Sequence, residues 1–242
     1  MAITFVNNGT ASTGGSAASC VITLPASLQA NDIVIAQIMI LEVATITPPD
    51  GTWNSIRSDG NSIQQTLFWH LVANSSESST TATFSFTAAF KSGDCIAYRG
   101  CDTVTPINQN SGRFSNSSAS FGNAAITPSV DNGMLTIFWG WNGSTTMTLS
   151  GTPTLTQRYA VTPSGGFGLI VGEVAAPSSG TAVTLSQYLC AQSPATNVEC
   201  QALILAPLVA AGGPPPEMFR RSFSTIQKIT YIRNLLAKPP IP

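Results

Sequence analysis

Charged side chains are scarce in this chain of 242 residues. Asp, Glu, Lys and Arg make up 9% of it, against about 25% in an average soluble protein. The hydrophobic fraction of 43% is ordinary, so Ser, Thr, Asn, Gln and Gly replace the missing charge. Such a neutral, hydroxyl-rich composition is common in secreted and virion β proteins, whose surfaces often pack against one another.

Histidine is almost absent, since His70 is the single one. Catalysis by a Ser-His-Asp triad would have to pass through it, but a lone histidine within a strand is most often structural. The sequence also lacks a Gly-x-Ser-x-Gly nucleophile elbow, a Gly-Lys-Ser/Thr phosphate loop and an Asp-x-Asp-x-Asp-Gly calcium loop. We therefore expect no catalytic residue and no cofactor, and we do not expect an enzyme.

Cysteines are few and widely spaced, which disfavours a zinc site because zinc sites use close cysteine or histidine pairs. No metal site is expected. An odd number of cysteines without an export signal favours free buried thiols, with a Cys95–Cys101 or Cys190–Cys200 bridge as the alternative. The five are Cys20, Cys95, Cys101, Cys190 and Cys200.

Long apolar runs are missing as well. No stretch of about 18 apolar residues occurs, so no transmembrane helix is expected. The first residues lack the positive region and continuous apolar core of a signal peptide. Before residue 214 no helical period is visible; instead, short runs of Val, Ile, Phe, Thr and Trp alternate with turn residues, which is typical of many short strands. We predict strands over 3–6, 20–24, 32–41, 52–57, 65–73, 81–87 and 94–100, then over 119–126, 134–141, 146–151, 154–160, 167–175, 181–189 and 197–208.

The two series of predicted strands resemble each other. "SCVITLPASLQANDIVIAQIMI" is echoed by "GNAAITPSVDNGMLTIFWGW", and "GDCIAYRG" by "VECQALILAP", which places Cys95 and Cys200 in register. The pseudo-repeats cover about 18–108 and 119–208. Two four-stranded halves make one closed two-sheet architecture. The prediction for residues 1–210 is therefore an all-β domain, a jelly-roll-like antiparallel β-sandwich of two similar halves.

Two of the predicted strands, 32–41 and 134–141, are apolar on both faces. A strand exposed on one side would alternate between apolar and polar residues. One face of each is expected in the sandwich core. The other needs cover from the C-terminal segment, from long loops or from a second subunit, and this is an argument for an oligomer.

The C-terminal segment differs from everything before it. Residues 1–210 carry five basic and ten acidic residues, whereas 211–242 carry five basic residues and Glu217. A basic segment on an acidic body is a hint of a docking arm. Gly and Pro residues over 211–216 predict a hinge, and Pro before Glu217 favours a helix start.

Within 217–242 apolar residues recur at spacings of three and four, which predicts an amphipathic helical arm. Such a helix is marginal alone and needs its apolar face packed. It could dock on its own body, on another subunit or virion lattice, or on a membrane surface. The predicted interaction residues of the arm are Phe219, Arg220, Arg221, Phe223, Ile226, Ile229, Ile232, Arg233 and Leu236.

The order "ANDIVIAQI…PPDGTWNSIRSDG…LFWHLVA…TATFSFT…GDCIAYRGCDTVTPI" resembles a family of tail-, head- or surface-associated proteins of bacteriophages and prophages. The resemblance covers about residues 18–208 and follows strands and turns. It departs from the family at Gly51-Thr52-Trp53, where the family has Gly-Trp, and the segment after 210 lies outside it. It implies a virion structural module with a jelly-roll-like sandwich.

On this basis we expect a capsid decoration or cement protein that stabilises the phage head, made in the host cytoplasm and located on the particle surface. Its expected partners are the major capsid protein or another virion lattice protein. Further copies of itself are also expected, with a trimer favoured by the resemblance. No nucleic acid and no membrane are expected as partners. The alternative is a receptor- or glycan-binding module of a tail or fibre that uses loops and exposed tryptophans.

Overall fold

The computed structural model describes residues 1–143, 146–161, 167–184 and 186–209. Contacts divide the chain into two units, Met1–Leu208 and Val209–Pro242. The first unit is described below. The hinge over 211–216 and the helical arm over 217–242 that the sequence predicts lie outside the described residues.

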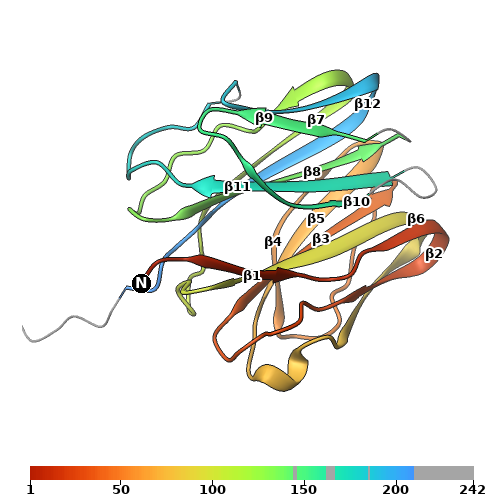
Figure 1. Ribbon diagram of the computed structural model, residues 1–242. Helices are drawn as coiled ribbons and strands as arrows, with labels where there is room; N and C mark the ends of the chain where they lie inside the picture. The colour runs from red at the N-terminus through yellow and green to blue at the C-terminus, as the bar shows by residue number, and fades with distance from the viewer. Residues whose placement is uncertain (144–145, 162–166, 185, 210–242) are drawn as a thin grey trace, which may run out of the picture. The chain divides into compact units, whose positions relative to one another are not determined.

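The first unit consists of strands and loops (Figure 1), and the all-β prediction is confirmed. In the described part of the chain the one helical segment is η1, a 3-10 turn over Ser75–Glu77. The strands are β1 (Thr4–Asn8), β2 (Ser12–Thr23), β3 (Ile33–Leu41), β4 (Trp53–Gly60), β5 (Ile63–Leu71), β6 (Thr81–Arg99), β7 (Ile107–Gly122), β8 (Met134–Asn142), β9 (Thr148–Gly151), β10 (Thr156–Val161), β11 (Phe167–Ala175) and β12 (Tyr188–Leu205).

The strands form two antiparallel sheets, and each sheet is drawn from one half of the chain. The first has the order β1-β6-β3-β5-β4, with β2 also paired to β6, and the second has the order β10-β11-β8-β12-β7, with β9 also paired to β12. Read from the opposite edge, the second order repeats the first, because β12, β8, β11 and β10 take the places of β6, β3, β5 and β4.

A β-bulge also recurs at the same place in the two sheets. In β4 the register against β5 shifts between Ser55 and Arg57, and in β10 the register against β11 shifts between Gln157 and Tyr159. A bulge opposes two residues on one strand to one on its partner. The repeated bulge therefore fixes which residues of the two halves are equivalent, and by this criterion Phe68 of β5 corresponds to Gly172 of β11.

The jelly-roll part of the prediction needs correction. Jelly rolls are built from Greek keys, in which four consecutive strands lie in the spatial order 4-1-2-3. Here β3, β4, β5 and β6 lie in the order β6-β3-β5-β4, which is 4-1-3-2. The β4–β5 hairpin places β5 beside β3 and leaves β4 at the edge, so the strand order differs from that of a Greek key.

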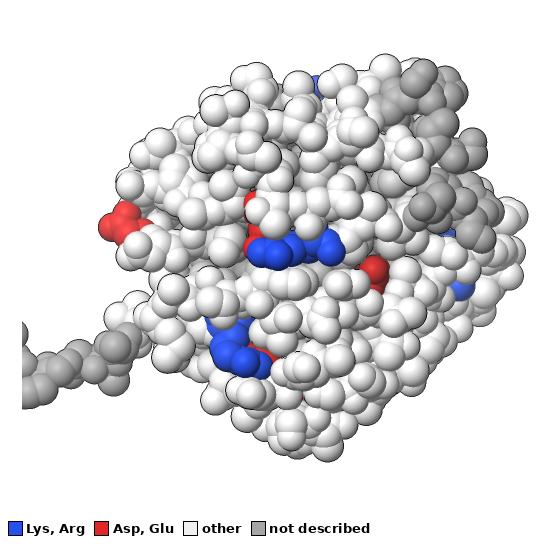
Figure 2. Space-filling view, in the orientation of Figure 1, with Lys and Arg blue, Asp and Glu red and all other residues white. Residues whose placement is uncertain are grey.

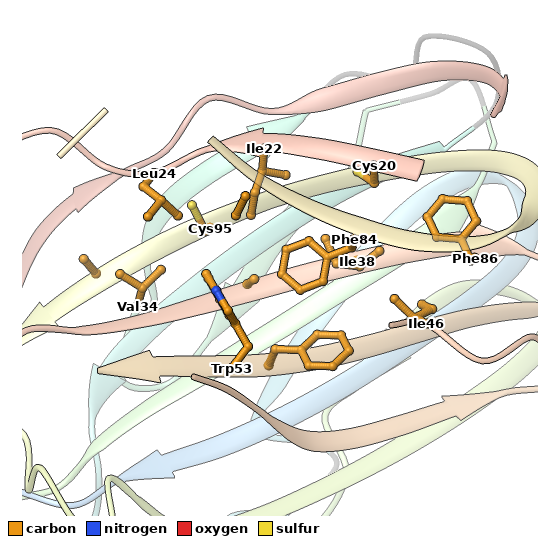
Figure 3. Packing of buried hydrophobic residues seen from close by; sticks show 14 of the residues in the cluster. Cys20, Ile22, Leu24, Val34, Ile38, Ile46, Trp53, Phe84, Phe86 and Cys95 are labelled. Carbon is orange, nitrogen blue, oxygen red and sulfur yellow. The ribbon is translucent and has the colours of Figure 1, made fainter. Parts of the chain in front are cut away.

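The core has three layers. Between the two sheets, alternate residues of β3 such as Ile33, Ile35 and Met39 pack with Phe138, Leu169 and other residues of the second sheet. The intervening residues of β3 point to the other side of the first sheet. There they pack under β2 and the first half of β6 (Figure 3). The second sheet has a matching outer layer built on Leu135, Ile137, Trp139 and Trp141 of β8.

The long strands β6 and β12 make these outer layers possible. The first part of β6 pairs with β2, whereas the last part, from Lys91 on, pairs with β3 and near its end with β1. Each sheet thus curls over its own central strand. The cover that the sequence analysis sought in the C-terminal segment, in loops or in a second subunit is supplied by the same sheet, so the argument for an oligomer from these apolar faces no longer holds.

Candidate functional site

The predicted interaction residues all belong to the segment 217–242 and so lie outside the described residues. The place where the first unit ends is described. The Met1 ammonium donates a hydrogen bond to the Leu208 carbonyl oxygen over 2.9 Å, and the Leu208 amide donates to Gly100. Both ends of the first unit are therefore held side by side, and the basic segment follows directly after this point.

The single histidine is held between an acid and a hydroxyl. His70, on β5, places Nε2 2.6 Å from Glu77 Oε2 and Nδ1 3.1 Å from Thr52 Oγ1, while its ring stacks on Trp53. An acid, a histidine and a hydroxyl in line are the elements of a nucleophilic triad. The Thr52 hydroxyl, however, also lies 2.5 Å from Asp50 Oδ1.

The positions of the hydrogens show that His70 does not activate the Thr52 hydroxyl. Asp50 also accepts from the Thr52 amide, and the pKa of Asp50 is lowered, first of all by the Thr52 hydroxyl. A carboxylate is an acceptor only, so the Thr52 hydrogen goes to Asp50 and not to the imidazole. The threonine oxygen is thus an acceptor toward His70, which is the reverse of an activated nucleophile. This arrangement joins the turn before β4 to η1.

A polar layer crosses the apolar core between the sheets. Gln37 Nε2 donates to Gln65 Oε1 over 2.7 Å and to the Trp139 carbonyl over 3.1 Å. The Tyr159 hydroxyl donates to Gln37 Oε1 over 2.6 Å, and Gln65 Nε2 donates to the Phe138 carbonyl. These buried amides are satisfied across the two halves. They therefore fix the register of one half on the other, since an unpaired partner would be costly.

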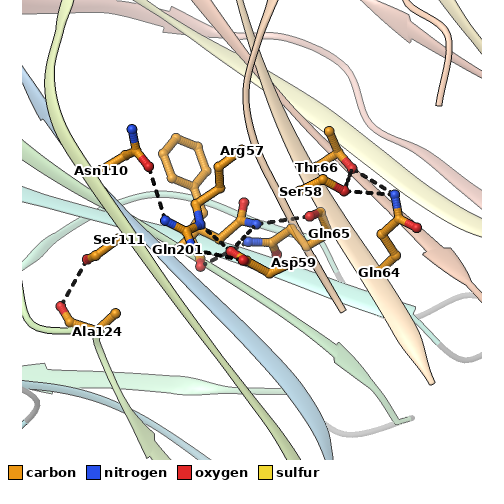
Figure 4. A network of polar contacts seen from close by, with 11 residues as sticks. Arg57, Ser58, Asp59, Gln64, Gln65, Thr66, Asn110, Ser111, Ala124 and Gln201 are labelled. Carbon is orange, nitrogen blue, oxygen red and sulfur yellow. Dashed lines mark hydrogen bonds and ion pairs between the residues drawn. The ribbon is translucent and has the colours of Figure 1, made fainter. Parts of the chain in front are cut away.

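The same layer continues to the rim as an ion-paired cluster (Figure 4). The Arg57 guanidinium donates to both carboxylate oxygens of Asp59 and to Asn110 on β7 over 3.0 Å. Gln201, on β12, donates to Asp59 Oδ2 and to the Gln65 carbonyl, each over 2.9 Å. Arg57 and Asp59 of the first half are thereby joined to two strands of the second.

Glu199 lies beside this cluster and is completely buried. Neither of its carboxylate oxygens has a hydrogen-bond partner among the described residues. Burial first and the Asp59 charge second raise the pKa of Glu199 to about 9, although Arg57 acts to lower it. Glu199 is therefore a neutral acid at pH 7 and does not provide a charge for binding.

A second buried acid, Glu173, is fully paired. Its Oε2 accepts from the Tyr98 hydroxyl over 2.5 Å, its Oε1 pairs with Arg158, and Thr136 donates to the Tyr98 hydroxyl. Arg158 also lies over the Phe5 ring at 4.1 Å from the centroid. The pKa of Tyr98 is raised well above its ordinary value, by burial first and then by Glu173. This group joins β6 and β1 of the first half to β11 and β10, and we assign it to stability.

A cavity of about 630 Å³ lies on the outer side of the first sheet and is lined by strands β4 and β5 and by the loop after β3. Its apolar lining includes Val43, Trp53 and Phe68, and its polar lining includes Ser58, Gln64 and Thr66. Of these residues Trp53, Ser58 and Phe68 belong to the stretches that carry the phage resemblance, and none of the six was predicted as a binding residue. The polar three come from neighbouring strands β4 and β5 and meet only once the hairpin has formed.

Among the described residues, neither the thiols nor the groups that could ligate a metal form a further site. The five cysteines are free and buried, and burial raises the pKa of Cys20 to about 11 and that of Cys101 to about 12. These thiols are thus protonated and inert at neutral pH. Within the described ranges, no three His, Cys, Asp or Glu side chains are arranged to hold a metal ion. In the same ranges, no helix is long and apolar enough to span a membrane.

Comparison with known proteins finds no relative, since no family model, no curated protein and no solved structure matches this chain.

Proposed function

We propose that the protein is a structural protein of a bacteriophage virion, a decoration or cement protein on the surface of the capsid. The proposal starts from the resemblance of residues 18–208 to virion-associated phage proteins. It is supported by a composition with 9% charged residues. Most of the surface that Figure 2 shows carries no charge. A neutral, hydroxyl-rich surface suits a protein that lies against other proteins over a wide area.

The observation that carries the proposal is the self-contained body. Both outer faces of the central strands β3 and β8 are covered within the same chain, and the two halves are joined by buried polar contacts such as the hydrogen bond from the Tyr159 hydroxyl to Gln37. Attachment to a partner then falls to the remaining segment. That segment is basic and follows Leu208 in the sequence.

The mechanism follows from this division of roles. The body lies over joints between capsid subunits, and the total interface area holds the joints against internal pressure. The arm over 217–242 binds acidic lattice surface or ties copies together. For the trimer, support now rests on the resemblance alone, because the sheets cover their own apolar faces.

The test is the protein content of purified particles of the phage or prophage whose genome encodes this chain. A cement protein should give a stained band that corresponds to hundreds of copies per particle. A minor band of a few copies would favour the alternative of a tail or fibre module. Absence of the band from washed particles would refute the virion assignment.

A further inference from the structure

The two halves share one strand order, so residues at equivalent positions of the two halves can be compared. The repeated bulge aligns Phe68 with Gly172, and the strand pairs that follow the bulge are Ser58–Thr66 in the first half and Ala160–Ile170 in the second. The polar residues of the cavity and their counterparts are Ser58 and Ala160, Gln64 and Gly168, and Thr66 and Ile170.

The second half fills the equivalent space with its own side chains. A Cβ on Gly168 would lie 2.0 Å from the Trp141 ring, and one on Gly172 would lie 2.8 Å from Leu149. The indole and the leucine therefore lie where the Gln64 and Phe68 side chains begin in the first half. Because the second half folds with apolar residues at these positions, the fold itself does not require the three polar residues.

In the first half Gln64 and Thr66 are buried and Ser58 is exposed, and hydrogen bonds join the three side chains to one another (Figure 4). Gln64 Nε2 donates to Ser58 Oγ over 2.9 Å and to Thr66 Oγ1 over 3.1 Å, and its Oε1 accepts from the Ala44 amide over 2.7 Å. The two hydroxyl oxygens lie 2.8 Å apart.

Counting hydrogens shows what remains for a ligand. The two amide hydrogens of Gln64 go to the two hydroxyl oxygens, and one hydroxyl hydrogen is shared between Ser58 and Thr66. Each hydroxyl carries a single hydrogen, so the second one is left to donate into the cavity. Gln64 holds both hydroxyls in place, which prearranges this donor.

We propose that this cavity binds one ring of a neutral saccharide. The residues that line it are all uncharged, which disfavours an ionic ligand. The polar part offers hydroxyls to a hydroxylated ligand, while the exposed Val43 and the largely buried Trp53 and Phe68 give an apolar lining for the C–H face of a sugar ring. Its volume of about 630 Å³ lies within the ~300–1,000 Å³ of small-molecule sites, which also occur at the mouths of β-barrels. The activity goes beyond a structural role and does not depend on the protein's place in the particle.

The experiment is saturation-transfer NMR on the full chain with the methyl glycosides of glucose, galactose and N-acetylglucosamine, and with cyclohexanol as an apolar ring. The test variant is Ser58→Ala with Thr66→Ile, which introduces residue types present in the second half. The matched control, Ser150→Ala with Thr148→Ile, makes the same exchanges at exposed positions of β9. Single Ser58→Ala removes one hydroxyl with the least effect on folding, and thermal melting is recorded for each variant.

We expect saturation transfer to at least one glycoside. Its affinity should fall about tenfold for each lost hydroxyl and stay unchanged in the control. Three results would overturn the proposal: no transfer to any of the three glycosides, equal binding by the folded Ser58→Ala variant, or cyclohexanol binding as tight as that of the sugars. The last would assign a purely apolar pocket.

Discussion

Replacing Glu199 by Gln should stabilise the protein, and the gain should grow with pH. The folded protein holds this acid neutral, with a pKa of about 9 against an ordinary value of 4.5. The unfolded chain can ionise it above pH 4.5, whereas the folded chain cannot until about pH 9. Stability therefore falls as pH rises between these two values.

The magnitude follows from the distance in pH. At pH 7 the gap to the ordinary pKa is 2.5 pH units, which at ~1.36 kcal/mol per unit amounts to about 3 kcal/mol. Glutamine has nearly the same shape and no ionised form, so the variant avoids this cost. At pH 5 the same calculation leaves about 1 kcal/mol.

The assay is urea unfolding of the wild type and of Glu199→Gln at pH 5, 7 and 8. Asp94, whose pKa burial raises to about 7, also lowers stability as pH rises, but it is present in both proteins and cancels in the difference. Glu42→Gln, at an exposed position, is the matched control and should show no gain. A gain that is equal at all three pH values, or a loss at pH 8, would refute the reasoning.

Three further predictions concern other parts of the chain. Gly168→Ala places a Cβ 2.0 Å from the Trp141 ring, so thermal melts should show a loss of stability of about 1–3 kcal/mol. The control Gly15→Ala should cost far less stability, because a Cβ there would meet nothing within 4 Å. His70→Gln should lose the Glu77 contact and about 1 kcal/mol of stability yet leave virion assembly and infectivity near wild type; loss of a hydrolytic activity in this variant would contradict the non-enzymatic assignment. In the arm, Phe223→Asp with Ile226→Asp should abolish attachment to particles, because burying each apolar side chain is worth roughly 1.5–3 kcal/mol. Arg220→Gln with Arg221→Gln should reduce attachment less, and the difference from wild type should shrink at high salt, because salt screens these charges in the wild type as well. Equal defects of the two variants in a particle-binding assay would contradict this order.

The fold class could be predicted from the sequence because the central strands are continuous apolar runs. The predicted strands 32–41 and 134–141 correspond closely to β3 and β8. The long strands could not be predicted in full. Ser92-Gly93-Asp94 resembles a turn, so 81–87 and 94–100 were expected as separate strands. In the structure β6 runs through this point because β2 pairs with its first part and β3 with its last.

The alignment of the two halves predicted from the sequence, with Cys95 opposite Cys200, is wrong in its register. Cys95 pairs with Ala36 on β3, and Cys200 pairs with Trp139 on β8. The bulge aligns Ala36 with Ile137, so the two cysteines differ by two positions and are not in register. Only the bulge fixes this alignment, and a bulge is a property of the paired strands that a single strand's sequence does not reveal.

The candidate cavity left one signal in the sequence. Gln64 and Thr66 stand in the first half where the second has Gly168 and Ile170, a polar departure within otherwise similar strands. Recognising it requires the correct register, which the sequence comparison lacked. The interaction residues predicted in the arm lie outside the described part of the chain and stay a prediction.

The measurement that tests the virion assignment and its mechanism most directly is co-sedimentation with phage particles that lack this protein. The full chain and a chain truncated at Gly212 are compared at equal concentration, after thermal melting has shown that both are folded. We predict that the full chain sediments with the particles in many copies and that the truncated chain stays in the supernatant. Equal binding of the truncated chain would contradict the role of the arm as the anchor, and no binding of the full chain would contradict the virion assignment itself.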